Sequence, residues 1–239
     1  MTGTFSVQYT FTGPEGVKEA FNLKIDTETI ERVHAPVVKP PSWAELSFEQ
    51  CPHCPLSADA HPYCPVAVNL VVIVDSFKGL MSYEQIHLEV VVEDRHIAQE
   101  TTVQKGISSL MGLLIATSGC PYTQFFKPMA RFHLPLASQA ETVFRATASY
   151  LLAQYFLHRD GMPVDYELTG LTGIYEDMQV VNVHVAKRLR SAIETDPAVN
   201  AIILLDVYSK SMPIVIEDSL EEIRPLFESF FEHLAGFQL

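Results

Sequence analysis

Each of the four cysteines in this chain is followed directly by a proline, and this constrains local folding more than any other feature of the sequence. The pairs begin at Cys51, Cys54, Cys64 and Cys120. Proline accounts for only 15 of 239 residues, so four pairs out of four are not expected by chance. A proline fixes its own φ and lacks a backbone N–H, so such a turn holds the preceding sulfur at a set angle.

The spacing of the cysteines, C-x2-C-x9-C-x55-C, favours a metal centre. Zinc ribbons and knuckles usually present two C-x2-C pairs, whereas here the second half is split. Three clustered cysteines and a remote fourth, each before proline, are more typical of cubane iron–sulfur ligands. We therefore expect all four cysteines to hold one [4Fe–4S] cluster in a redox or sensory protein.

Zinc is the alternative occupant. His53 lies inside the CPHC motif and His61 precedes Cys64 by three residues, so a Cys3His site is also available. The metal would then be structural, in a binding or regulatory protein. Free or buried cysteines in a proline-rich loop are the chemically inert alternative.

The tetrapeptide CPHC also occurs in strongly oxidising members of the thioredoxin superfamily. In that fold the first cysteine begins a helix that follows a strand. Here no β-like segment precedes Cys51, and Pro55 and Pro62 prevent a long helix. Thiol–disulfide exchange is therefore the last of the alternatives.

The position of Cys120 favours a ligand over a nucleophile. It follows a predicted helix that Gly119 is placed to end. The partial negative charge at a helix C-terminus disfavours a free thiolate. A bound cation compensates for that charge, so a ligating thiolate is less affected.

Composition bounds the class of protein and its partners. An apolar fraction of 48% with 19% charged residues is typical of a globular chain. A net charge of −13, without a cluster of lysine or arginine, argues against nucleic acid or an anionic membrane as a partner. The first twenty residues lack a secretory signal, so we expect a cytoplasmic location, where cysteines suit metal ligation better than disulfides. A redox partner protein and self-association stay open.

The apolar pattern predicts an α+β fold in one domain over 1–239, with a mixed or antiparallel sheet and a mostly helical second half. Its parts are a β-hairpin over about 1–34, a proline-rich connector over 35–47, the cysteine cluster 51–64 and an α/β remainder. Alternating or β-branched segments predict strands over 5–11, 20–25, 66–76, 86–93, 200–208 and 213–217, and 96–103 is either a further strand or the lead-in to the next helix. Helices are predicted over 104–117, 138–158, 178–194 and 219–235, the second of them central in the core, with capping boxes at Ser138 and Ser219.

A second candidate site follows the fourth cysteine. The segment 119–145 contains Arg131, His133, Glu141 and Arg145 in apolar surroundings. Arg131 and His133 could face a cluster or an anionic ligand, with Glu141 orienting them, because charges among apolar residues usually need a reason. The alternative is a solvated stripe with a hydrogen-bonded core histidine. No standard catalytic signature is present, and whether the chain is an enzyme stays open.

The motifs CPHCPL, CPVAVNL, SGCP, PMARFHLPLAS, ET-x2-R and YLLAQYF together resemble an uncharacterised family of bacterial proteins, a domain of unknown function. The resemblance covers the whole chain, including the N-terminal YTF hairpin. It implies no activity, substrate or partner, and it supports only the treatment of the cysteines and residues 128–145 as one unit.

Overall fold

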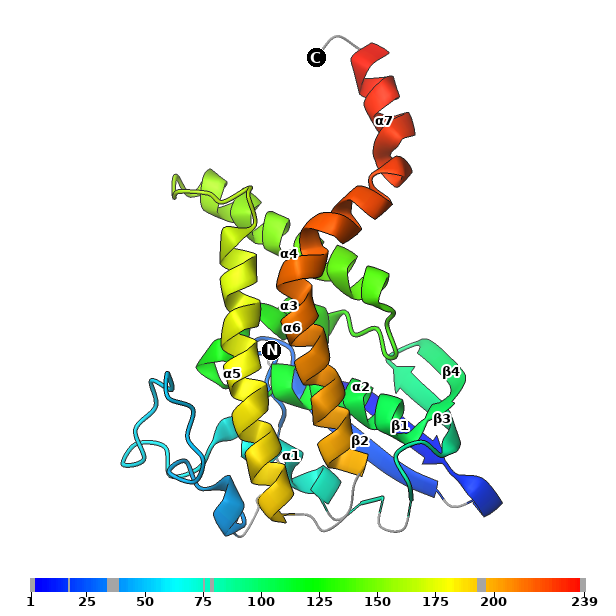
Figure 1. Cartoon of the computed structure of the whole chain (residues 1–239), viewed down its shortest axis with the longest axis vertical. Coiled ribbons are helices and arrows are strands. Elements are labelled where there is room, and N and C mark those ends of the chain that lie inside the picture. The colour runs from blue at the N-terminus through cyan, green and yellow to red at the C-terminus, as the bar shows by residue number, and fades with distance from the viewer. Residues whose placement is uncertain are drawn as a thin grey trace.

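The structure is a computed structural model, and an antiparallel sheet at one end of it is covered by helices (Figure 1). This arrangement confirms the predicted α+β class. The residues that the structure describes are 3–16, 18–33, 39–74, 76–77, 80–192 and 197–236. Residues 34–38, which include the start of the predicted connector, lie outside them.

The sheet has the strand order β2-β1-β3-β4, with every neighbouring pair antiparallel. Its strands are β1 (Thr4–Thr12), β2 (Lys18–Asp26), β3 (Gln85–Val92) and β4 (Arg95–Thr102). The first two form the predicted hairpin, joined through a 3-10 turn, η1 (Pro14–Gly16). Alternate residues of β1 are buried against the helices, as the period-two pattern requires.

The prediction of a strand over 66–76 is wrong, because this part of the chain forms helix α1 (Pro65–Val74). A short continuous run of apolar residues does not distinguish a buried strand from a buried helix. Pro65 suits the first position of a helix, where no N–H is needed. The buried Val66, Leu70 and Ile73 then recur at helical spacing in the core.

Helix α2 (Val103–Ala116) is the helix predicted over 104–117, and it packs against the sheet and α6. Gly119 follows with φ of 78°, in the left-handed region that suits glycine. The chain continues through η3 (Pro121–Phe126) into the short helix α3 (Lys127–Arg131). Another 3-10 turn, η2 (Ser42–Ala44), precedes the cysteine cluster.

Helix α4 (Gln139–Arg159) begins with the predicted capping box at Ser138, but its predicted central place in the core is wrong. Its second half presents Leu152, Tyr155 and Phe156 to solvent. The apolar character of this segment therefore reports an uncovered helix surface rather than a buried helix.

Helices α5 (Thr169–Ala192) and α6 (Pro197–Ile223) run side by side (Figure 1). The strands predicted over 200–208 and 213–217 are wrong, since both segments lie within α6. The apolar run there packs along α5 and α2 instead of entering a sheet. Ser219 is also inside α6, so the final helix α7 begins later and spans Pro225–Gly236. No helix in the described part of the chain has the length and apolar character that crossing a membrane requires.

Candidate metal centre

The four cysteines lie around one small cavity of about 20 Å³, here called the cysteine cavity. They come from two parts of the chain: Cys51, Cys54 and Cys64 from the stretch between η2 and α1, and the distant Cys120 from the residue before η3. All four thiols are free. The remaining lining residues are mostly apolar: Leu46, Leu56, Pro65, Val66, Val181 and Val185. Gln50, Tyr122 and Arg188 are the polar ones.

The first two cysteines are presented by a tight turn. The Cys54 N–H donates to the Cys51 carbonyl at 3.0 Å, which folds the chain around the proline and histidine between them. The Gln50 side chain donates to the Leu56 carbonyl at 3.0 Å and closes the surrounding loop. This turn brings both sulfurs to the same cavity.

Cys64 and Cys120 have the same local structure: each directly precedes a helical turn with proline at its first position. The Cys64 carbonyl accepts from the Val68 N–H at 3.0 Å at the start of α1, and the Cys120 carbonyl accepts from the Thr123 N–H at 3.0 Å at the start of η3. Proline fits there because the first N–H of a helix has no partner to lose. Two of the four Cys-Pro pairs are thus helix starts.

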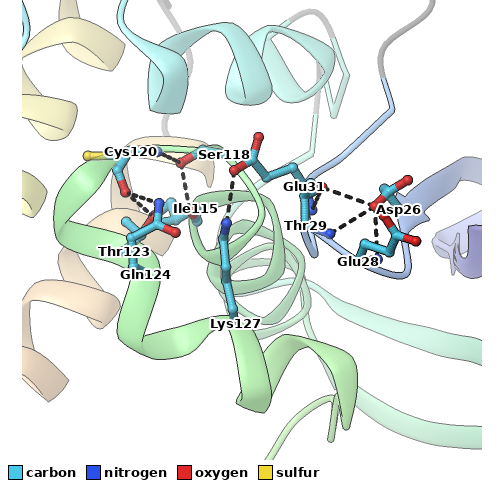
Figure 2. Close-up of polar contacts among 10 residues, drawn as sticks. All are labelled: Asp26, Glu28, Thr29, Glu31, Ile115, Ser118, Cys120, Thr123, Gln124 and Lys127. Atoms are coloured by element: carbon cyan, nitrogen blue, oxygen red, sulfur yellow. Dashed lines mark hydrogen bonds and ion pairs between the residues drawn. The ribbon is translucent and has the colours of Figure 1, made fainter. Parts of the chain in front are cut away.

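The main chain of Cys120 is held on both sides (Figure 2). Its N–H donates to Ser118 Oγ at 3.3 Å, and its carbonyl also accepts from the side chains of Thr123 and Gln124 at 3.0 and 2.9 Å. In Figure 2 the sulfur points away from these polar groups. A nearby ion pair of 2.8 Å between Lys127 and Glu31 ties the same segment to the chain after β2.

Arg188 of α5 is the residue of this site that the sequence analysis missed. This residue lines the cysteine cavity and is only 2% exposed. It donates to the main-chain oxygens of Trp43 and Glu45 at 2.8 Å each and of Leu46 at 3.1 Å. The sequence did contain a signal for Arg188: it lies three residues after Val185, close to the apolar face of the helix. A charge there is costly without a partner, so its position indicates buried acceptors.

Arg188 also positions Cys64 through these oxygens. The chain from 44 to 46 runs beside the chain from 62 to 64: Cys64 N–H donates to the Ala44 carbonyl at 2.8 Å, and Leu46 N–H donates to the Pro62 carbonyl at 2.9 Å. The arginine therefore fixes the segment on which Cys64 depends.

Burial keeps the thiols of Cys51 and Cys120 protonated unless a cation replaces their protons. Burial raises the pKa of the Cys51 thiol to about 12, with the nearby Cys64, Cys120 and Cys54 as smaller causes. Burial likewise raises the pKa of the Cys120 thiol to about 11. A disulfide oxidant needs a lowered thiol pKa, so these shifts are the opposite of what thiol–disulfide exchange requires.

The two histidines considered as zinc ligands do not line this cavity. His61 is exposed. The His53 ring stacks on Tyr122 with centroids 4.0 Å apart, and its Nε2 lies 3.3 Å from the main-chain oxygen of Asp177. Within the described ranges, no group of three or more His, Cys, Asp or Glu side chains is already gathered as a site for one metal ion.

The four candidates of the second site are separated by the structure. Arg131 pairs with Glu93 at 3.2 and 3.3 Å near the sheet, with its guanidinium over the Phe5 ring. Glu141 belongs to the capping box, accepting from the Ser138 N–H at 2.7 Å. Only His133 and Arg145 line a common space.

That space is a cavity of about 400 Å³, here called the large cavity. It lies among α2, the chain from α3 to α4, α5 and α6, and no cysteine lines it. His133 is 8% exposed, and its Nε2 lies 2.6 Å from the hydroxyl of Tyr9. Burial, with smaller contributions from Arg145 and Arg95, lowers the pKa of His133 to about 3, so the ring is neutral.

A family model described as a domain of unknown function, DUF6901, matches residues 7–228. This confirms the resemblance to a domain of unknown function; the bacterial origin and the shared motifs stay predictions. No curated protein and no solved structure matches the chain at a significant level.

Proposed function

The chain belongs to the DUF6901 family, a domain of unknown function, and we propose that it is a metal-centre protein whose four cysteines hold one [4Fe–4S] cluster. The observation that carries the proposal is the convergence of every cysteine of the chain on one cavity. The loop of residues 51–64 and the distant Cys120 have to be folded together to produce it. Four free thiols gathered without a disulfide, with the pKa values of Cys51 and Cys120 raised by burial, are chemically useful as ligands of a cation.

A cluster suits the cysteine cavity better than a zinc ion. Four thiolates on one zinc, at about 2.3 Å each, would bring the sulfurs to about 3.8 Å from one another and close the space between them. In a cubane each cysteine binds a different iron, so the sulfurs stand further apart around the core. Among the described residues no three potential ligands are gathered closely enough for one metal ion, which favours the wider spacing of a cluster. The cavity of about 20 Å³ between the thiols would have to widen to take the cubane core.

The surrounding charge also fits an anionic centre. A [4Fe–4S]²⁺ core with four thiolates has a net charge of about −2 and gains another negative charge on reduction. Arg188 is a buried cation on the wall of the cavity. Its charge stabilises the thiolates and favours the reduced form, because charges interact strongly away from water.

The ligand set defines the kind of chemistry. Four protein ligands leave no open iron for a substrate, so the centre serves electron transfer or sensing rather than Lewis-acid catalysis. Cys51, Cys54 and Cys64 are half-buried while Cys120 is buried, so the loop that carries the first three is the exposed side of the site. A redox partner protein would contact this loop, and the expected cytoplasmic location would keep the thiols reduced.

The decisive experiment is elemental analysis of protein purified without oxygen. We expect brown protein with about four irons and four sulfides per chain. Cys120→Ser and Cys51→Ser should lose them, whereas His61→Ala, an exposed site in the same loop, should keep them. Colourless protein with one zinc per chain would overturn the cluster and support the structural-zinc alternative. Protein with neither metal would leave the cysteines as free thiols.

A further inference from the structure

The large cavity has the size and the walls of a ligand site. Its volume of about 400 Å³ falls in the range of small-molecule pockets, about 300–1,000 Å³. Most of its wall is apolar, and the main apolar side chains come from α2, η3, α3, α5 and α6. The main apolar residues are Leu113, Phe126, Met129, Met178, Leu204 and Leu205.

Arg145 provides a cation on this wall that makes no ion pair with a carboxylate in the described part of the chain, although the nearby charge of Glu141 acts on its pKa. Its Nη2 donates to the main-chain oxygens of Met129 and Phe132 at 2.8 and 2.9 Å, which fixes the guanidinium. Glu141, one helical turn earlier, is occupied in the capping box with Ser138. The remaining donors of Arg145 are therefore available to an anion, and a half-buried charge gains from such a partner.

Two neutral polar groups face the same space. His133 uses Nε2 for the Tyr9 hydroxyl, which also contacts Ser109 Oγ at 2.9 Å, so its position is fixed while Nδ1 is left without a protein partner among the described residues. Tyr175 is buried on the wall, and its hydroxyl also has no hydrogen-bond partner there. Both groups can contact a bound molecule without adding charge.

The charged side chains on the wall of the large cavity are all positive. Arg145 and Lys105 are its charged residues, and no described carboxylate lines it. We propose that the large cavity binds a small organic carboxylate with an apolar body, the carboxylate pairing with Arg145 and the body lying against Leu113, Met129 and Leu204. This site is independent of the metal centre, since the two cavities share no lining residue.

Isothermal titration calorimetry of the full, metal-loaded chain tests the proposal with octanoate and 3-phenylpropionate, each beside its neutral alcohol and octanoate also beside octylamine. We expect at least one acid to bind, at least tenfold more tightly than its alcohol, and octylamine to bind more weakly still. Arg145→Gln should weaken the acid by about 10- to 100-fold, the effect of losing hydrogen bonds to a charged group. Arg131→Gln removes the same charge outside the cavity and should leave the affinity unchanged.

A second variant keeps the test decisive if Arg145→Gln does not fold. A Cβ added at Gly112 meets only Leu205 at 4.0 Å, so Gly112→Ala should be tolerated, whereas Gly112→Leu fills part of the large cavity. We expect Gly112→Leu to abolish acid binding with unchanged metal content. The proposal is overturned if neither acid binds, if acids and alcohols bind alike, or if Gly112→Leu binds as tightly as the wild type.

Discussion

Each of the two cavities has on its wall an arginine that donates hydrogen bonds to main-chain oxygens of another segment. The cavities differ in the source of the negative charge that can pair with this arginine. Arg188 is almost fully buried and donates to three oxygens, while Arg145 is half-buried and donates to two. Beside Arg188 the chain itself supplies thiols that can become thiolates. Beside Arg145 the described chain supplies no paired carboxylate, so the anion has to come from outside.

Removing the metal should affect the protein more than any substitution below. The segment 42–64 has one helical turn, η2, and carries three of the four cysteines of the cavity, so a bound metal would tie it to Cys120. We expect chelation under anaerobic conditions to lower the amide protection of this segment by about 100-fold or more, because metal binding contributes folding free energy. Strands β1 and β3 should keep their protection. Hydrogen exchange read by mass spectrometry measures both, and equal exchange with and without metal would contradict the expectation.

Replacing Arg188 and Arg145 by methionine, one at a time, compares how much each arginine contributes to the stability of the fold. Arg188→Met leaves one buried and two part-buried oxygens without their donor and should lower the free energy of unfolding by about 3 kcal/mol. Arg145→Met affects two less buried oxygens and should cost about 1 kcal/mol. Denaturant unfolding measures both. A larger loss for Arg145→Met would break the comparison.

The lowered pKa of His133, which lines the large cavity, predicts that the free energy of unfolding depends on pH through this residue. Its pKa of about 3 in the folded chain lies below the ordinary 6.5, so the unfolded chain binds the extra proton between these values. Stability should therefore fall as the pH drops, by about 2 kcal/mol from this residue between pH 7 and pH 5. His133→Gln should lose that slope and the exposed His61→Gln should keep it. Identical slopes for the wild type and His133→Gln would refute the assignment.

The capping box at Ser138 offers the smallest and sharpest test. Ser138→Ala should cost about 1 kcal/mol of stability, the usual effect of a lost N-cap. It also frees Glu141 to pair with Arg145 one turn away, so octanoate should bind a few-fold more weakly. Adding Glu141→Gln to that variant should restore the affinity. If the double variant binds as weakly as Ser138→Ala, Glu141 does not compete for Arg145.

The fold was predictable where side-chain period and local caps agree. The hairpin of β1 and β2 alternates cleanly, and Ser138 and Glu141 mark the start of α4. The errors at α1 and α6 fall on continuous apolar runs, which carry no period that separates strand from helix. There the choice depended on which neighbours could cover the run, and α2 and α5 cover it as helices.

The sequence by itself determined that the four cysteines sit at chain turns, because proline restricts the backbone wherever it occurs. Only the tertiary structure decided that these turns meet at one cavity, that His53 and His61 stay outside it, and that Arg188 lies on its wall. It also grouped His133 with Arg145 while Arg131 and Glu141 took other partners. The reason is physical: covalent geometry acts within a few residues, whereas a cavity is made by elements packed across more than a hundred.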